Sequence, residues 1–73
     1  PKYASYTNYL LEQGIYKILK KMSEEHIELL LAAKNPNLEE IKYEISDYLY
    51  HLMIMMVEKG ITWEDVTQEL AQR

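Results

Sequence analysis

The strongest constraint on the fold of this chain is a turn near its middle. Asn35-Pro36-Asn37 separates two long stretches of helical sequence, residues 15–34 and 38–59. Proline does not continue a helix, and asparagine favours turns and helix caps. Two long helices joined by so short a turn pack side by side in opposite directions. The sequence therefore predicts an antiparallel helical hairpin.

Apolar side chains recur along both stretches at the i, i+3, i+4, i+7 spacing of an amphipathic helix. In the first stretch they are Ile15, Ile18, Leu19, Met22, Leu29 and Ala33. In the second they are Leu38, Ile41, Ile45, Tyr48, Leu49, Leu52 and Met56. Asn37 can cap the second stretch, with Glu40 at the capping-box position, and Gly60 ends it. We therefore expect each helix of the hairpin to bury one face.

A shorter helix is predicted before the hairpin. Residues 1–4 form a lead-in, and Ser5 or Thr7 can cap a helix that reaches about Gln13. Gly14 then ends this helix, because glycine adopts the left-handed conformation that closes helices at little cost.

Another short helix is predicted after the hairpin. Thr62 and Asp65 form a capping box, and the helix continues to about Gln72. Its inner face is expected to consist of Trp63, Val66 and Leu70. No stretch shows the alternation of a strand, so the predicted fold class is all-α.

The length of the chain limits how large a core it can form. Its 73 residues predict a single domain over 1–73, and 48% of them are hydrophobic. A domain of this size buries little surface and is marginally stable alone. We therefore expect the helical bundle to be completed by self-association, as a homodimer or a higher homo-oligomer.

The charge and cysteine content exclude several function classes. A net charge of −4 argues against non-specific nucleic-acid binding and against an anionic membrane surface. No apolar run approaches the roughly 18 residues of a membrane span. The chain has no cysteine, so it offers no thiolate metal site. This composition is compatible with a reducing, cytoplasmic setting.

Two acidic clusters lie in the stretches that the hairpin brings together. Glu25 and Glu28 are three residues apart in the first, and Glu44 and Asp47 are three apart in the second. This spacing places each pair on one helix face. At about 100° per residue, Glu25 falls at the edge of the apolar stripe rather than opposite it. Four carboxylates can therefore meet across the helix pair, although such pairs are also common on solvated helix faces.

Carboxylates held this close destabilise a fold unless a positive charge lies between them. Oxygen ligands alone suit Mg²⁺, or Mn²⁺, better than Zn²⁺ or Cu²⁺. A di-iron bundle would need Glu-x-x-His motifs, but Ser23 stands three residues before His26 and Tyr48 three before His51. The predicted ligands of a magnesium site are Glu25, Glu28, Glu44 and Asp47.

A carboxylate-bound Mg²⁺ typically completes its shell with phosphate oxygens, so the chemistry indicated is hydrolysis of a phosphoanhydride in a phosphorylated nucleotide. Glu24 could hold metal or accept the proton of the attacking water, or be a solvated glutamate. Lys20 or Lys21 could reach a phosphate, or be solvated helix charges. His51 could contact a phosphate or base, or be a bundle histidine bonded to a backbone or carboxylate partner.

At these residues the chain resembles a known group. Glu-Glu-x-x-Glu followed by Glu-x-x-Asp resembles the metal signature of the all-α, MazG-type nucleoside triphosphate pyrophosphohydrolases. The flanking strings narrow the resemblance to the phosphoribosyl-ATP pyrophosphohydrolases of histidine biosynthesis. These strings are Ser5-Tyr6-Thr7-Asn8-Tyr9-Leu10, Lys17-Ile18-Leu19-Lys20-Lys21, Ala32-Ala33-Lys34-Asn35, Tyr50-His51-Leu52 and Glu58-Lys59-Gly60-Ile61-Thr62-Trp63.

The resemblance covers nearly the whole chain and implies Mg²⁺-dependent hydrolysis of phosphoribosyl-ATP to phosphoribosyl-AMP and pyrophosphate. It also implies a cytoplasmic helical bundle that dimerises. The positions that match the family's metal ligands are Glu25, Glu28, Glu44 and Asp47, with Glu24 beside them.

The chain also departs from the family pattern. The family usually begins with a further helix, which we expect this chain to lack. Ser23, His26 and Ile27 stand inside the acidic signature where smaller or more polar residues are usual, and Tyr16, Tyr43 and Tyr48 are bulkier than expected. Two alternatives remain open at this point. One is a house-cleaning pyrophosphohydrolase with another nucleotide substrate. The other is a non-catalytic or engineered assembly module on the same scaffold.

Overall fold

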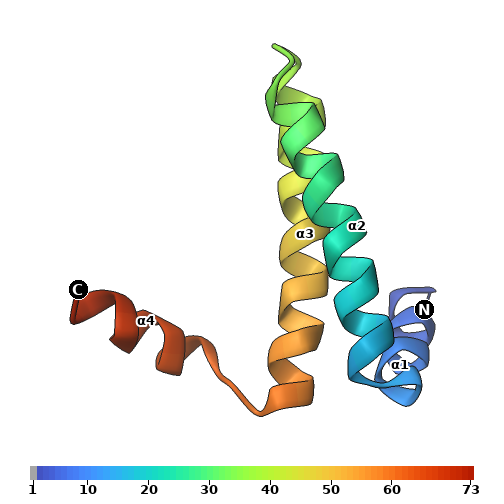
Figure 1. Ribbon diagram of the computed structural model, residues 1–73, viewed down its shortest axis with the longest axis vertical. Coiled ribbons are helices and arrows are strands. Elements are labelled where there is room, and N and C mark those ends of the chain that lie inside the picture. The colour runs from blue at the N-terminus through green and yellow to red at the C-terminus, as the bar shows by residue number, and fades with distance from the viewer. Residues whose placement is uncertain (1) are drawn as a thin grey trace.

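The computed structural model describes residues 2–73, and this part of the chain contains four α-helices and no strand. The helices are α1 (Lys2–Gln13), α2 (Ile15–Ala33), α3 (Leu38–Lys59) and α4 (Trp63–Ala71). Figure 1 shows α2 and α3 as a long antiparallel hairpin, with α1 folded against the end opposite the turn. The predicted all-α hairpin is confirmed.

The turn of the hairpin is fixed by local hydrogen bonds. Asn35 donates its backbone N–H to the carbonyl of Ala32 at 3.0 Å, which closes the end of α2. Asn37 then caps α3, because its side-chain oxygen accepts the backbone N–H of Glu40 at 3.2 Å. The proline between these two asparagines separates the helices, so α3 starts at the residue that the sequence indicates.

The start of α1 differs from the prediction. The helix begins at Lys2, so the expected lead-in over residues 2–4 is helical and neither Ser5 nor Thr7 acts as its cap. Lysine and alanine propagate helices well, and nothing between Lys2 and Ser5 breaks one. Gly14 ends α1 as expected, with φ 92° and ψ −177°, a conformation that side-chain-bearing residues avoid.

A small apolar core joins the first three helices. Leu10 of α1 and Ile18 of α2 are fully buried, and Ile54 of α3 packs with them. This cluster lies toward the end of the hairpin that α1 covers. Docking of α1 therefore supplies one of the three buried side chains around which the hairpin closes.

The last helix packs against none of the other three in the described part of the chain, and Figure 1 shows it pointing away from the hairpin. Its predicted cap is confirmed, since Thr62 and Asp65 form a reciprocal capping box. The backbone N–H of Thr62 holds the pKa of Asp65 below its ordinary value. The expected inner face is wrong for a single chain, because Trp63 and Leu70 are 46% and 62% exposed.

Exposed apolar side chains also lie along the hairpin. They include Leu30, Leu31, Leu38, Tyr43, Ile45, Leu49, Met53 and Val57. None of the helices described is both long enough and apolar enough to span a bilayer.

Candidate metal centre

Four carboxylates from the two long helices meet in the middle of the hairpin. Glu25 and Glu28 extend from α2, and Glu44 and Asp47 extend from α3. One oxygen of each lies within 4.8 Å of the others. The i, i+3 spacing puts each pair on one helix face, and the antiparallel packing turns the two faces toward each other. The structure thus brings together the four residues that the spacing selected. Below we call them the carboxylate cluster.

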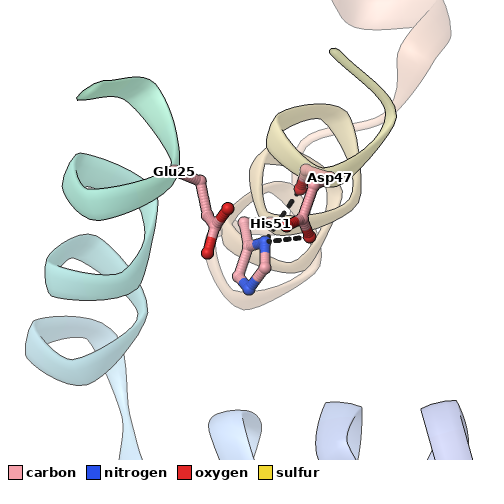
Figure 2. Close-up of side chains that lie close together, drawn as sticks. All are labelled: Glu25, Asp47 and His51. Carbon is pink, nitrogen blue, oxygen red and sulfur yellow. Dashed lines mark hydrogen bonds and ion pairs between the residues drawn. The ribbon is translucent and has the colours of Figure 1, made fainter. Parts of the chain in front are cut away.

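Glu25 occupies the most enclosed position in the carboxylate cluster. Its side chain reaches from α2 toward Asp47 and His51 of α3 (Figure 2), and the residue is only 7% exposed. Glutamate is rarely buried without a partner that carries the opposite charge. No lysine or arginine forms an ion pair with Glu25 in the described part of the chain.

The electrostatics of the carboxylate cluster reflect this crowding. Burial raises the pKa of Glu25 to about 7, and a shared hydrogen bond with Asp47 and the charges of Asp47 and Glu28 add to the effect. Desolvation, followed by the charges of Glu28 and Asp47, also raises the pKa of Glu44. Both carboxyl groups therefore hold protons more tightly than a solvated glutamate does.

Two oxygens of the carboxylate cluster have no donor within the described chain. Glu25 Oε2 and Glu44 Oε1 are both buried and lack a hydrogen-bond partner. A buried oxygen without a partner costs roughly 1–3 kcal/mol, so such atoms are rare in folded proteins. A hard divalent cation would satisfy both oxygens and offset the repulsion between the four carboxylates. The residues present therefore fit a metal ion.

His51 lies beside Asp47 at the carboxylate cluster. Its Nδ1 donates to the backbone carbonyl of Asp47 at 2.8 Å and lies 3.5 Å from Asp47 Oδ1. Its Nε2 is 3.0 Å from the hydroxyl of Tyr6. The residue is 3% exposed and both ring nitrogens are engaged, which favours the bundle-histidine alternative over contact with a phosphate or base.

The remaining predicted site residues lie on α2 outside the carboxylate cluster. Glu24 is 48% exposed at its side chain and lies 3.5 Å from the Lys21 ammonium. Partial burial lowers the pKa of Lys21, but its attraction to Tyr6 and Glu24 outweighs that effect and leaves the pKa above the ordinary value. Lys20 is exposed. The structure therefore sets Glu24 and Lys21 as a pair and does not bring Lys20 to the carboxylates.

Two of the unusual residues contact each other. The imidazole of His26 on α2 packs against the ring of Tyr48 on α3. Ile27, the third departure within the signature, is exposed. His26 therefore packs against Tyr48 across the hairpin. Its position in the sequence did not indicate this packing role.

Sequence reasoning missed the contribution of α1 to this region. The hydroxyl of Tyr6 donates to His51 Nε2, and Thr7 hydrogen-bonds the hydroxyl of Tyr50. Forty-five residues separate Tyr6 from His51, so no spacing rule connects them. The only signal was the presence of Tyr6 and Thr7 in the string that carries the family resemblance.

Comparison with known proteins identifies the family of the chain. The sequence model of the family described as phosphoribosyl-ATP pyrophosphohydrolase matches residues 1–73. The chain is 51% identical, over its whole length, to 69% of the phosphoribosyl-ATP pyrophosphatase of Limosilactobacillus fermentum. It is 55% identical to 70% of the protein of that name from Listeria innocua.

Longer relatives contain a matching segment. The chain is 55% identical, over its whole length, to 36% of a histidine biosynthesis bifunctional protein of Caldanaerobacter subterraneus. It thus spans about a third of such bifunctional proteins and about two thirds of the pyrophosphatases. The match over all of residues 1–73, together with the carboxylate cluster, establishes that the chain belongs to the phosphoribosyl-ATP pyrophosphohydrolase family, a family of hydrolases.

Proposed function

We propose that the chain hydrolyses phosphoribosyl-ATP to phosphoribosyl-AMP and pyrophosphate, with Mg²⁺ as cofactor and Mn²⁺ as a possible replacement. Family membership supplies the substrate class, and the relatives named above are phosphoribosyl-ATP pyrophosphatases. The observation that carries the proposal is the carboxylate cluster, with two buried oxygens that lack a donor. A folded chain keeps such an arrangement when a cation satisfies it.

The reaction sets two tasks for the chain. Water adds across the bond between the α- and β-phosphates, so pyrophosphate leaves and one proton must be taken from the water. The polyphosphate carries several negative charges and would be repelled by an uncompensated acidic cluster. Bound Mg²⁺ would supply positive charge that holds the phosphates there. Its ligands would be the four members of the carboxylate cluster.

Residues beside the carboxylate cluster are the candidates for the other roles. Glu24 is solvent-accessible and next to a metal-ligand position, so it can accept the proton from water. Lys21 lies one helical turn before it, where an ammonium can meet a phosphate oxygen. Lys20, exposed on the same helix, is the weaker candidate for phosphate contact. His51 would act on the cluster rather than on the substrate, because its ring is buried.

Self-association is part of the proposal. The unpartnered α4 and the exposed apolar side chains of the hairpin leave much of one domain without a cover. A homodimer or higher homo-oligomer would bury them and complete the bundle. Light scattering at micromolar concentration tests this, and a stable monomer would contradict it.

The activity is tested by pyrophosphate release. The protein is incubated with Mg²⁺ and phosphoribosyl-ATP, and separately with a panel of nucleoside triphosphates. We expect release from phosphoribosyl-ATP and its loss in Glu25→Gln and Asp47→Asn. No release at high protein concentration would overturn the proposed reaction. Preference for another triphosphate would replace the substrate, and release that survives both substitutions would overturn the site assignment.

A further inference from the structure

A chain of contacts connects α1 to the carboxylate cluster. The hydroxyl of Tyr6 lies 3.0 Å from His51 Nε2, and His51 Nδ1 lies 2.8 Å from the carbonyl oxygen of Asp47. The same Nδ1 is 3.5 Å from Asp47 Oδ1. Each His51 ring nitrogen thus has a hydrogen-bond partner, a hydroxyl at Nε2 and a carbonyl oxygen at Nδ1.

The direction of these bonds follows from the atoms involved. A carbonyl oxygen only accepts, so His51 Nδ1 must carry a hydrogen. In the neutral imidazole, Nε2 is then the acceptor, and the Tyr6 hydroxyl donates to it. The Tyr6 hydroxyl therefore favours the tautomer in which the Nδ1 hydrogen faces Asp47.

Packing fixes the plane of the imidazole as well. The His51 ring packs in T-shaped arrangements with Tyr6 and Tyr50, with ring centroids 5.7 Å and 5.2 Å apart. A turn of the ring would break the contacts of both nitrogens and the packing against these two aromatic rings. Asp47 therefore lies beside an imidazole that Tyr6 of α1 and Tyr50 of α3 both hold in place. Figure 2 shows Asp47 beside this ring and Glu25 facing both from α2.

We propose that Tyr6 is a positioning residue that acts through His51 to orient Asp47 toward Glu25, so that the docking of α1 sets the affinity of the carboxylate cluster for divalent cations. This inference rests on the proposed metal site. Removing a group that hydrogen-bonds a metal ligand without touching the metal commonly weakens metal affinity about 10- to 100-fold. Tyr6 acts one contact further out, so the lower end of that range is expected.

The test compares two hydroxyl deletions at neighbouring positions of α1. Tyr6→Phe removes the bond to His51 and keeps the ring. Thr7→Val removes a second hydroxyl bond between α1 and α3, from Thr7 to Tyr50, and leaves the hydrogen bonds of His51 in place. Mg²⁺ and Mn²⁺ affinities of the full chain are measured by calorimetry, and melting temperatures are measured in a chelator. Circular dichroism confirms that each variant folds.

We expect Tyr6→Phe to weaken cation binding about tenfold and Thr7→Val to leave it within about twofold, in line with the effects of outer groups on metal sites. If the two hydroxyls only stabilise the fold, each substitution should lower the melting temperature measured in a chelator. Neither substitution should then change the cation affinity. Equal weakening in the two variants would overturn the route through His51, because it would show that α1 docking alone matters.

A double-mutant cycle isolates the route. In a His51→Phe background the connection is already broken, so adding Tyr6→Phe should cost no further affinity. If Tyr6→Phe weakens cation binding as much in the His51→Phe background as in the wild type, the inference is overturned. If His51→Phe does not fold, the comparison of Tyr6→Phe with Thr7→Val still tests the inference. Failure of the wild-type chain to bind Mg²⁺ would instead sink the metal site and with it the proposed function. Tight wild-type binding that Tyr6→Phe leaves unchanged would sink only this inference.

Discussion

The imidazole of His26 and the phenol ring of Tyr48 lie 5.6 Å apart between centroids, with their planes inclined by 52°, across the interface of α2 and α3. The family resemblance leads us to expect smaller side chains at both positions. Their contact joins α2 to α3 through two aromatic rings. An aromatic pair of this kind contributes roughly 0.5–1.5 kcal/mol beyond simple burial.

Replacing His26 by alanine should therefore lower stability and spare the metal site. We expect His26→Ala to reduce the free energy of unfolding by about 1 kcal/mol, the typical worth of such a ring contact. Urea denaturation measures this change. Mg²⁺ affinity should stay at the wild-type value, because His26 is not part of the carboxylate cluster. A large loss of affinity would show that His26 contacts the metal site after all.

The raised pKa of Glu25 predicts a pH dependence for the metal-free protein. Its ordinary pKa of 4.5 rises to about 7 in the fold, so the folded state binds the proton more tightly than the unfolded chain does. This stabilisation is fully present below pH 4.5 and is lost as pH rises through 7. A shift of that size corresponds to a loss on the order of 3 kcal/mol.

Melting temperatures in a chelator at pH 5.5 and pH 8 would show this loss, and Glu25→Gln should flatten the difference. Added Mg²⁺ should raise the melting temperature far more at pH 8, because metal ligands must be ionised. A metal-free protein that is equally stable at both pH values would contradict the burial of Glu25.

Neutralising one member of the carboxylate cluster should have opposite effects with and without metal. Glu44 has a buried oxygen without a donor and is repelled by Glu28 and Asp47. Glu44→Gln should therefore raise the melting temperature in a chelator, because one repelling charge is removed. The same variant should gain less stability from Mg²⁺. Glu39→Gln is a contrasting control on the same helix: exposed Glu39 pairs with Lys42 instead of facing other carboxylates, so its neutralisation should not raise the melting temperature.

Loss of the cap of α4 should be felt locally. Thr62→Ala removes the hydroxyl that accepts the backbone N–H of Asp65. Loss of such a cap typically costs about 1 kcal/mol of stability. Faster amide exchange over Trp63–Ala71 would report it. Because α4 packs on none of the other helices in residues 2–73, exchange in α2 and α3 should not change in a monomer. Thr67→Ala, inside α4, serves as the control, since alanine suits a helix interior.

The hairpin and the carboxylate cluster were predictable because both follow from local periodicity. Once Pro36 sets the turn, the positions of Glu25 and Asp47 on facing helix faces follow from 3.6 residues per turn. The bond from Tyr6 to His51 was not predictable, because it depends on where α1 docks after the chain reverses at Gly14. The exposure of Trp63 was also missed, since an amphipathic pattern shows that a face is apolar but not what covers it.

The placement of the core sets an order in which the hairpin comes apart. Leu10, Ile18 and Ile54 fasten the end that α1 covers, whereas the turn at residues 34–37 lies at the far end with mostly exposed neighbours. The carboxylate cluster stands between these two ends and, without a cation, pushes the helices apart. In the metal-free protein, local unfolding should therefore begin at the turn, while the end that α1 covers stays folded. A bound cation would hold α2 and α3 together at a second point, between the core and the turn.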